Sequence, residues 1–170
     1  NPSAPTFVGD FVPTAAVLAD DVYVSGKYAY IAAQDAYGLI IVDISNPSHP
    51  FMVSNVNTSG TAFDVYVSGK YAYVADGASG LQIIDVSNPY SQVLKGTFNT
   101  SGTAYSVYVS GKYAYVADDT SGLQVINISN PYAPVLAGTY DTPGAGYSVF
   151  VSGRYVYLAD AGSGLRVIDI

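Results

Sequence analysis

Short stretches in which apolar and polar residues alternate recur along the whole chain. The nine residues V-Y-V-S-G-K-Y-A-Y begin at Val22, Val65 and Val107, and a fourth copy, V-F-V-S-G-R-Y-V-Y, begins at Val149. The period is about 42 residues, and self-similarity at a fixed period of this length is the signature of a repeat architecture. The chain therefore consists of copies of one small structural unit.

Each unit predicts four short β-strands. The V-Y-V stretch and the Y-A-Y-V-A-D stretch are separated by Ser-Gly-Lys, which favours a tight hairpin turn. A polar turn ending in glycine precedes an apolar run such as L-I-I-V-D, and Ser-Asn-Pro ends that strand because proline has no amide donor. A last segment, such as P-V-L-A-G-T-Y-D-T from Pro134, leads to the next unit. The turn glycines are Gly38, Gly80, Gly122 and Gly164.

The first two strands of each unit carry apolar residues at both odd and even positions. Side chains alternate between the two faces of a strand, so both faces of each sheet must be buried. Sheets that are stacked radially and covered on both sides by their neighbours meet this demand. The pattern predicts an all-β β-propeller of four four-stranded antiparallel blades. A parallel β-solenoid is the structural alternative, although its coils are shorter and lack regular hairpin turns.

The two ends of the chain predict how the last blade is completed. Residues 1–5, N-P-S-A-P, align with residues 130–134, so the chain starts at the opening of a fourth strand, and it ends where a third strand closes. One domain is expected over residues 1–170, with repeats 22–64, 65–106 and 107–148, and with 149–170 completed by 1–21. We expect residues 6–11 to pair with residues 165–170.

That pairing has two further forms. The N-terminal strand could instead complete the last blade of a neighbouring chain, which would build a fibre. Two chains could also form one eight-bladed ring. Pairing within one chain is favoured because tethering raises the effective concentration of the two partners.

Composition narrows the classes of partner. The formal charge is −7 and the pI is about 4.1, which argues against nucleic acid, since phosphate binding needs a basic surface. No apolar run is long enough for a spanning helix. There is no Cys, so disulfides and thiol chemistry are excluded. Because the first residue is Asn1, a secretion signal is expected to have been removed already. Low charge and richness in Thr, Ser, Gly and Tyr suggest the outside of a microbial cell.

The Leu39 to Asp43 run, L-I-I-V-D, and its copies resemble the LVIVD-repeat family of microbial cell-surface proteins. The Y-V-A-D and D-V-S-N-P segments are similar to that family as well, and the resemblance covers nearly the whole chain. It implies a propeller on an exported or surface-layer protein and no defined activity. Asn127 departs from the final Asp of the motif, and Ala33 stands where the other copies have Asp.

The sequence predicts no enzyme. Catalysis needs a poised acid, base, nucleophile or metal, and no nucleophile elbow, phosphate-binding loop or zinc-protease motif is present. The single histidine, His49, lies between Ser48 and Pro50 in a loop and is not repeated. We expect it to be an exposed loop residue.

Asp76, Asp118 and Asp160 occupy one position of the repeat, at the turn between the second and third strands. They are the candidate metal ligands, joined by Asp119 and Asp35, because carboxylates and turn carbonyls are the ligands that Ca²⁺ prefers. The alternative is an Asx turn, in which each Asp accepts nearby backbone N–H bonds. The turn is favoured, because equivalent positions on separate blades lie far apart, and no other cofactor is expected.

Pairs of tyrosines stand two residues apart and therefore share one face of a strand. Exposed pairs could stack on sugars, whereas buried pairs would fill the space between blades, which is the favoured interpretation. The pairs are Tyr28/Tyr30, Tyr71/Tyr73, Tyr113/Tyr115 and Tyr155/Tyr157.

Three N-x-S/T sequons make Asn57, Asn99 and Asn127 candidate glycosylation sites. Asn57 and Asn99 share one loop position, whereas Asn127 ends a strand and is the weakest of the three.

Two functional classes are open. The first is a non-enzymatic extracellular or cell-surface module with a structural or adhesive role, which would bind itself in an oligomer or fibre, or bind other cell-surface components. The second is a ligand-binding propeller that recognises a glycan in the manner of a lectin. Loops that repeat almost unchanged favour the first, because a specific site needs loops that diverge.

Overall fold

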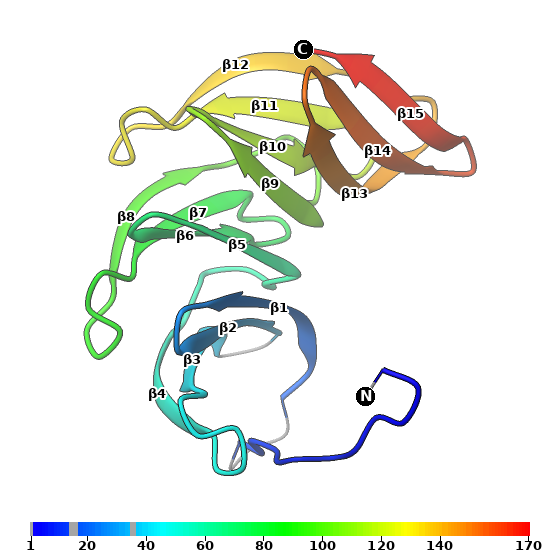
Figure 1. Cartoon of the computed structure of the whole chain (residues 1–170). Coiled ribbons are helices and arrows are strands. Elements are labelled where there is room, and N and C mark those ends of the chain that lie inside the picture. Colours follow the sequence, from blue (N-terminus) through cyan, green and yellow to red (C-terminus); the bar gives the residue numbers. More distant parts are fainter. Residues whose placement is uncertain (1, 14–16, 35–36) are drawn as a thin grey trace.

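The structure is a computed structural model, and it describes residues 2–13, 17–34 and 37–170. Within these residues the chain forms four antiparallel sheets and no helix (Figure 1). We refer to the sheets as blades 1 to 4 in chain order. The predicted all-β propeller architecture with four repeats is confirmed. The described residues contain no helix that is long and apolar enough to cross a membrane.

In each blade the strands follow one another in sequence order. Blade 1 contains β1 (Ala19–Ser25), β2 (Tyr28–Ala33), β3 (Gly38–Asp43) and β4 (Phe51–Val56). Blade 2 contains β5 (Asp64–Ser68), β6 (Tyr71–Ala75), β7 (Leu81–Asp85) and β8 (Val93–Phe98). Blade 3 contains β9 (Ser106–Ser110), β10 (Tyr113–Ala117), β11 (Leu123–Asn127) and β12 (Val135–Tyr140). Blade 4 contains β13 (Ala145–Ser152), β14 (Tyr155–Ala161) and β15 (Gly164–Asp169).

The Ser-Gly-Lys segments form the predicted two-residue hairpin turns. Ser25 pairs with Tyr28, which leaves Gly26 and Lys27 as the turn, and Gly26 has a φ of 59°. A positive φ is easily reached only by glycine, and turns of this kind match the twist of the two strands that they join. The same geometry recurs in the other three blades, so each repeat begins with a fixed register.

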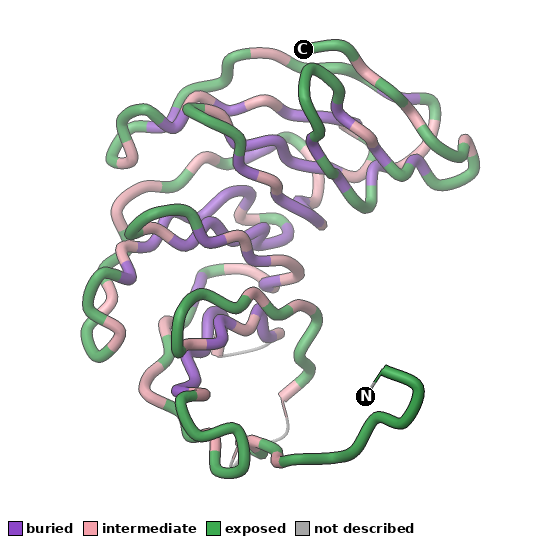
Figure 2. The backbone as a smooth tube through the Cα atoms, in the orientation of Figure 1, coloured by how far each residue is buried: buried purple, intermediate pink, exposed green. Residues whose placement is uncertain are grey.

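The core lies between the blades, as the apolar pattern predicts. One cluster joins Leu39 and Ile41 of blade 1 to Val65 and Val67 of blade 2, and two further clusters repeat this arrangement at the next boundaries. All six residues of β3 are buried. Figure 2 shows the buried positions running through the interiors of the blades, with exposed positions at the turns and outer strands.

The blades form an open arc, and the fourth sheet has three strands (Figure 1). The predicted pairing of residues 6–11 with residues 165–170 of the same chain is not what the structure shows. The described N-terminal residues form no strand; Gly9 and Phe11 lie against blade 1, and the segment before them extends into the gap, apart from β15 (Figure 1). The physical reason is the angle between neighbouring blades, which leaves the two ends of the arc apart.

Candidate functional site

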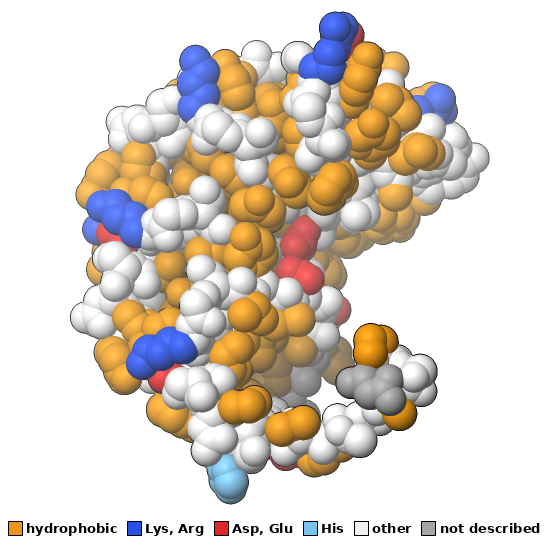
Figure 3. Space-filling view, viewed as in Figure 1, with side chains coloured by type: hydrophobic (Ala, Val, Ile, Leu, Met, Phe, Trp, Pro, Cys, Tyr) orange, Lys and Arg blue, Asp and Glu red, His pale blue; other side chains and the backbone are white. Residues whose placement is uncertain are grey.

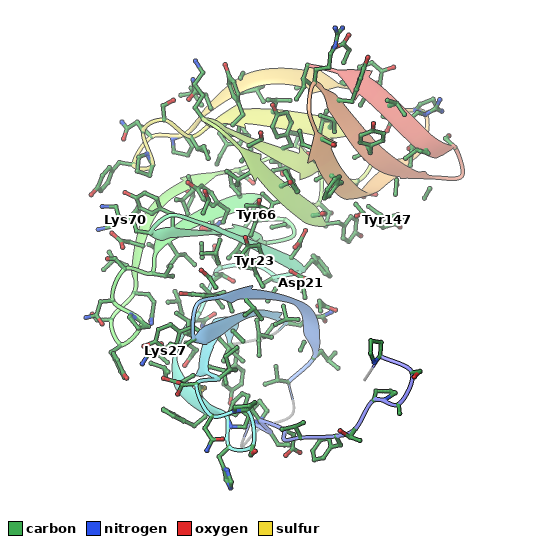
Figure 4. The ribbon with its side chains drawn as sticks, viewed as in Figure 1. Asp21, Tyr23, Lys27, Tyr66, Lys70 and Tyr147 are labelled. Carbon is green, nitrogen blue, oxygen red and sulfur yellow. The ribbon has the colours of Figure 1, made fainter. Side chains whose placement is uncertain are left out.

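The innermost strands line the concave side of the arc and present a row of aromatic rings. Tyr23 on β1 packs against Tyr66 on β5 with ring centroids 5.1 Å apart. Tyr66 packs against Tyr108 on β9 at 4.9 Å, and Tyr108 against Phe150 on β13 at 4.9 Å. Figure 4 shows Tyr23 and Tyr66 on neighbouring blades. We call this row the inner aromatic row. It links all four blades along one continuous wall.

A second, shorter row runs parallel to it. Phe63 packs against Tyr105 with centroids 5.0 Å apart, and Tyr105 packs against Tyr147 at 4.8 Å. Tyr147 is 49% exposed at the end of the row. Tilted rings at these separations stabilise each other beyond the area that they bury. Both rows end on blade 4 with rings that are open to solvent.

Polar side chains of the same strands join each blade to the next. The Asp21 carboxylate accepts the backbone N–H of Val65 at 3.1 Å, and the Asp64 carboxylate accepts that of Val107 at 2.8 Å. At the third boundary the Ser106 hydroxyl accepts the N–H of Val149 at 3.3 Å. Figure 3 shows acidic side chains gathered in the hollow of the arc. These bonds satisfy main-chain N–H donors that would otherwise be buried at the blade boundaries without a hydrogen-bond partner.

The electrostatics of Asp64 differ from those of an exposed acid. Burial, followed by a hydrogen bond to the neighbouring Asp21 carboxyl, raises the pKa of Asp64 to about 7, against the opposing effect of its bonds from Ser106 and Val107. The Asp64 carboxyl therefore holds its proton to a higher pH than an exposed aspartate does. Burial also raises the pKa of Tyr66 to about 12, helped by the hydroxyl of Tyr108.

The candidate metal ligands lie one at each blade boundary. Asp76 is fully buried, and its carboxylate accepts hydrogen bonds from the Thr58 hydroxyl at 2.6 Å and from the Gly60 N–H at 2.8 Å. Thr58 and Gly60 belong to the loop that joins blade 1 to blade 2. We call this arrangement the loop clasp. Burial raises the pKa of the Asp76 carboxyl, and the two hydrogen bonds oppose that shift.

Asp118 makes the same clasp one repeat later. It accepts bonds from the Thr100 hydroxyl at 2.5 Å and from the Gly102 N–H at 2.9 Å. Its pKa is also raised, mainly by burial. Two successive blade boundaries are thus closed by the same three groups.

Asp160 is held differently. One carboxylate oxygen accepts a bond from Arg166 Nε at 2.9 Å, and the other, Oδ1, is buried without a hydrogen-bond partner in the described chain. Thr142, the counterpart of Thr58, donates instead to the carbonyl of Gly144 at 3.3 Å. Pro143 occupies the loop position of Ser59 and Ser101. The third clasp is therefore incomplete.

The structure does not bring these carboxylates together. Among the described residues, no three His, Cys, Asp or Glu side chains form a group that could hold a metal ion. Asp119 lies beside Asp118 with a φ of 49°, and Asp35 lies outside the described residues. Calcium binding at Asp76, Asp118 and Asp160 stays a prediction.

The Asx-turn interpretation is wrong for Asp76 and Asp118, because their carboxylates accept hydrogen bonds from the preceding loop. Local turns of that kind occur at the end of the third strand instead. Ser45 N–H donates to Asp43 at 2.8 Å, and Ser129 N–H donates to Asn127 at 3.0 Å.

The tyrosine pairs lie at the blade boundaries. Tyr30, Tyr73 and Tyr115 are buried in the core clusters, which confirms the packing interpretation for them. The first tyrosine of each pair lies nearer the surface, under the cation of the hairpin turn. Lys27 Nζ lies 5.1 Å from the ring centre of Tyr28, and the other three repeats show the same contact.

His49 is exposed, as expected, and its backbone N–H donates to the backbone carbonyl of Asn46 at 3.0 Å. Of the sequon residues, Asn57 and Asn99 are exposed in equivalent loops, whereas Asn127 is half-buried within β11. A pocket of about 250 Å³ lies beside Asn57 and is also lined by Gln82. The geometry therefore keeps the same order among the three candidates as the sequence does.

Sequence reasoning missed the inner aromatic row and the loop clasp. The V-Y-V alternation contained a signal for the row, because side chains alternate along a strand and the tyrosine therefore lies on the other face from the two valines. A signal for the clasp was present in the first repeat. Where Ala33 replaces the clasp Asp, the position that corresponds to Thr58 is Ala15. Loss of both partners together points to a contact between them.

Comparison with protein families decides the relationship. The family model described as the LVIVD repeat matches residues 18–58, 59–100, 101–142 and 143–170. The chain belongs to the LVIVD-repeat family. A search of curated proteins finds no match for this LVIVD-repeat chain.

Solved structures share its fold. The computationally designed Ika4 protein is 9% identical with a TM-score of 0.74, over 98% of this chain and 99% of that one. The Cps50 (Swd1) beta-propeller domain of Myceliophteria thermophila is 12% identical with a TM-score of 0.75, over 91% of this chain and 54% of that one. The computationally designed Ika8 protein is 11% identical with a TM-score of 0.69, over 87% and 44%. The LVIVD-repeat chain thus spans about half of the length of the last two.

Proposed function

We propose that this LVIVD-repeat chain is a non-enzymatic extracellular or cell-surface module with a structural or adhesive role that assembles with copies of itself. The observation that carries the proposal is that its repeated polar and aromatic side chains contact neighbouring blades. The clasp aspartates, the inner-wall carboxylates and the inner aromatic row all join one blade to the next.

Polar and aromatic side chains that hold one blade to the next suit a structural scaffold. A catalytic or binding site usually lies on loops that a rigid fold presents, and it departs from the repeat. Here Asp76 and Asp118 accept equivalent bonds from equivalent loops, and Lys27 and Lys70 lie over the equivalent tyrosine of their repeats. Repetition of side-chain contacts, and not only of sequence, is the support for a scaffold.

A specific observation also favours the second candidate, a glycan-binding module. Tyr147 and Phe150 end the two aromatic rows on the concave wall with 49% and 55% of their surface exposed. Exposed aromatic rings can stack on the apolar face of a sugar. This site would lie on blade 4.

One measurement tests the proposed location, and a second separates the two candidates. Antibodies against the chain, applied to unpermeabilised source cells, are expected to label the cell surface, and unlabelled surfaces with label only after permeabilisation would contradict the proposed location. A glycan array probed with the purified chain is expected to show no saturable binding. Binding that is lost on Tyr147→Ala would make the lectin the better assignment.

A further inference from the structure

The two ends of the arc expose the two halves of one kind of interface. Between blades 2 and 3, Leu81 and Ile83 are fully buried against Val107 and Val109. At the free face of blade 4, the counterparts Leu165 and Val167 are 64% and 56% exposed. At the free face of blade 1, the counterparts Val22 and Val24 are 57% and 58% exposed. Each face is therefore shaped to pack on the other.

The N-terminal segment already lies where the outer strand of a preceding blade would lie. A Cβ at Gly9 would be 2.5 Å from the carbonyl oxygen of Pro47, just as a Cβ at Gly96 would be 2.2 Å from that of Pro131. Phe11 packs against the core of blade 1, as Phe98 on β8 packs against the core between blades 2 and 3. Residues 9–11 thus repeat the contacts that an outer strand makes with the following blade.

A pocket on the opposite end fits the turn that precedes this segment. It has a volume of about 290 Å³ and is lined by Tyr115, Gly138 and Ile170 among others. No atom of the described chain lies within 4 Å of a Cβ built at Gly138, although the equivalent Gly96 is covered by the turn at Pro131. The residues that align with that turn begin at Pro2, since N-P-S-A-P matches N-P-Y-A-P.

The free edge of β15 and the N-terminal segment also match in register and charge. In blade 3, Gln124 pairs with Thr139 and Asn127 pairs with Val135. Transfer of this register by one repeat places Arg166 opposite Asp10 and places Asp169 opposite Thr6. An arginine and an aspartate that face each other across two strands attract, which favours this pairing over a shifted one.

We propose that two copies of this chain close into one ring of eight blades, in which residues 6–11 of each copy form the fourth strand of blade 4 in the other copy. The Pro2 turn then fills the pocket at Gly138. One arc matches 54% of the Cps50 beta-propeller domain, so a single chain corresponds to about half of such a propeller. Residues 6–11 of each copy meet β15 of the other, so the two contacts are related by a two-fold axis and the assembly is closed. The inference rests on the proposed scaffold role and names its partner.

The chain has no cysteine, so a disulfide can report the pairing directly. One copy carries Thr6→Cys and the other carries Asp169→Cys, and the two are mixed under oxidising conditions. We expect a cross-linked dimer that elutes at twice the 17.8 kDa mass of the chain in light scattering. A doubly substituted chain is expected to give the same dimer, with both bonds formed. Asp169 makes only an exposed ion pair with Arg154, so its loss should leave the fold intact.

Gly138→Val separates association from folding. The single chain has open space at this position, so we expect an unchanged melting temperature at low concentration and at least a tenfold weaker dimer. Gly96→Val is the matched change at a covered position, and it is expected to lower the melting temperature itself.

Three results would overturn the ring. The first is a cross-linked monomer from the doubly substituted chain, which means closure within one chain. The second is a ladder of larger species, which means an open fibre. The third is a lack of cross-linking together with a monomeric mass. A fibre would leave the scaffold role standing. Surface labelling tests that role independently of the mass.

Discussion

The carboxylate of Asp64 accepts the backbone N–H of Val107 at 2.8 Å, across the boundary between blades 2 and 3. The acceptor is the first residue of β5, and the donor lies one repeat further along the chain. Asp64, whose pKa is raised to about 7, is thus bonded to the main chain of the next blade. The stability of the arc is therefore linked to pH.

Asp64 is expected to make the fold less stable as the pH rises. Its pKa of about 7 lies above the ordinary value of 3.8, so the folded state binds the proton more tightly than the unfolded chain does. The contribution is complete below pH 4 and is lost as the pH rises through about 7. Asp64→Ser gives blade 2 the residue that blade 3 has at this position, where the Ser106 hydroxyl accepts the N–H of Val149. We expect it to flatten the pH dependence by on the order of 2 kcal/mol between pH 4 and 8 in urea unfolding.

The matched control for that experiment is Asp141→Asn, an exposed change away from the inner wall. It should leave the slope of stability against pH near that of the unmodified protein. A steep profile that persists in Asp64→Ser would show that another group carries the effect.

The loop clasp predicts a position-dependent cost for removing a hydroxyl. Thr58→Ala leaves a buried Asp76 oxygen without its donor, and we expect a loss of about 1–3 kcal/mol in the free energy of unfolding. Thr142→Ala is the matched change, because Thr142 donates to Gly144 instead of Asp160, and a smaller loss is expected. Equal losses would mean that the clasp bond adds nothing beyond the burial of threonine.

The inner aromatic row predicts that its middle matters more than its end. Tyr66 contacts rings on both sides, whereas Phe150 has one ring neighbour in the row and is 55% exposed. Tyr66→Ala is expected to cost about 3 kcal/mol in chemical unfolding, and Phe150→Ala clearly less. Tyr66→Phe keeps the ring and should retain most of the stability. The opposite order would place the main packing at the end of the arc.

Calcium removal is expected to leave the fold unchanged. The carboxylates of Asp76 and Asp118 already accept two bonds each from the chain, so a metal would have to displace them. Melting curves with calcium and with a chelator should coincide. A rise in melting temperature with calcium that disappears in Asp118→Asn would support the metal assignment.

Most of the fold could be predicted because its causes are local. The hairpin at Gly26 is fixed by a glycine with positive φ, and the burial of both faces follows from apolar residues at successive positions, as in β3. The closure could not be predicted in the same way. Whether residues 6–11 reach β15 depends on the angle between blades, which results from how whole faces such as Leu81 and Val107 pack.

The candidate site was harder, because its partners are distant in sequence. Asp76 was identified as a repeated acid, but its partner Thr58 lies in the preceding loop on the other side of a hairpin. Asp21 and Asp64 occupy the start of equivalent strands, and only the curvature of the arc brings their carboxyl groups together. The repeat pattern therefore identifies these aspartates but does not predict which groups they contact.

The bonds along the inner wall all run in one direction, from an acceptor in one blade to a main-chain donor in the next. A unit with its own acceptor and donor can be copied without any change to its neighbours, because each new junction reproduces an old one. Gene duplication in steps of one whole repeat would thus yield a foldable product at once. The spacing of 43 residues from Val22 to Val65, against 42 between the later copies, shows that a single extra residue away from the junctions is tolerated.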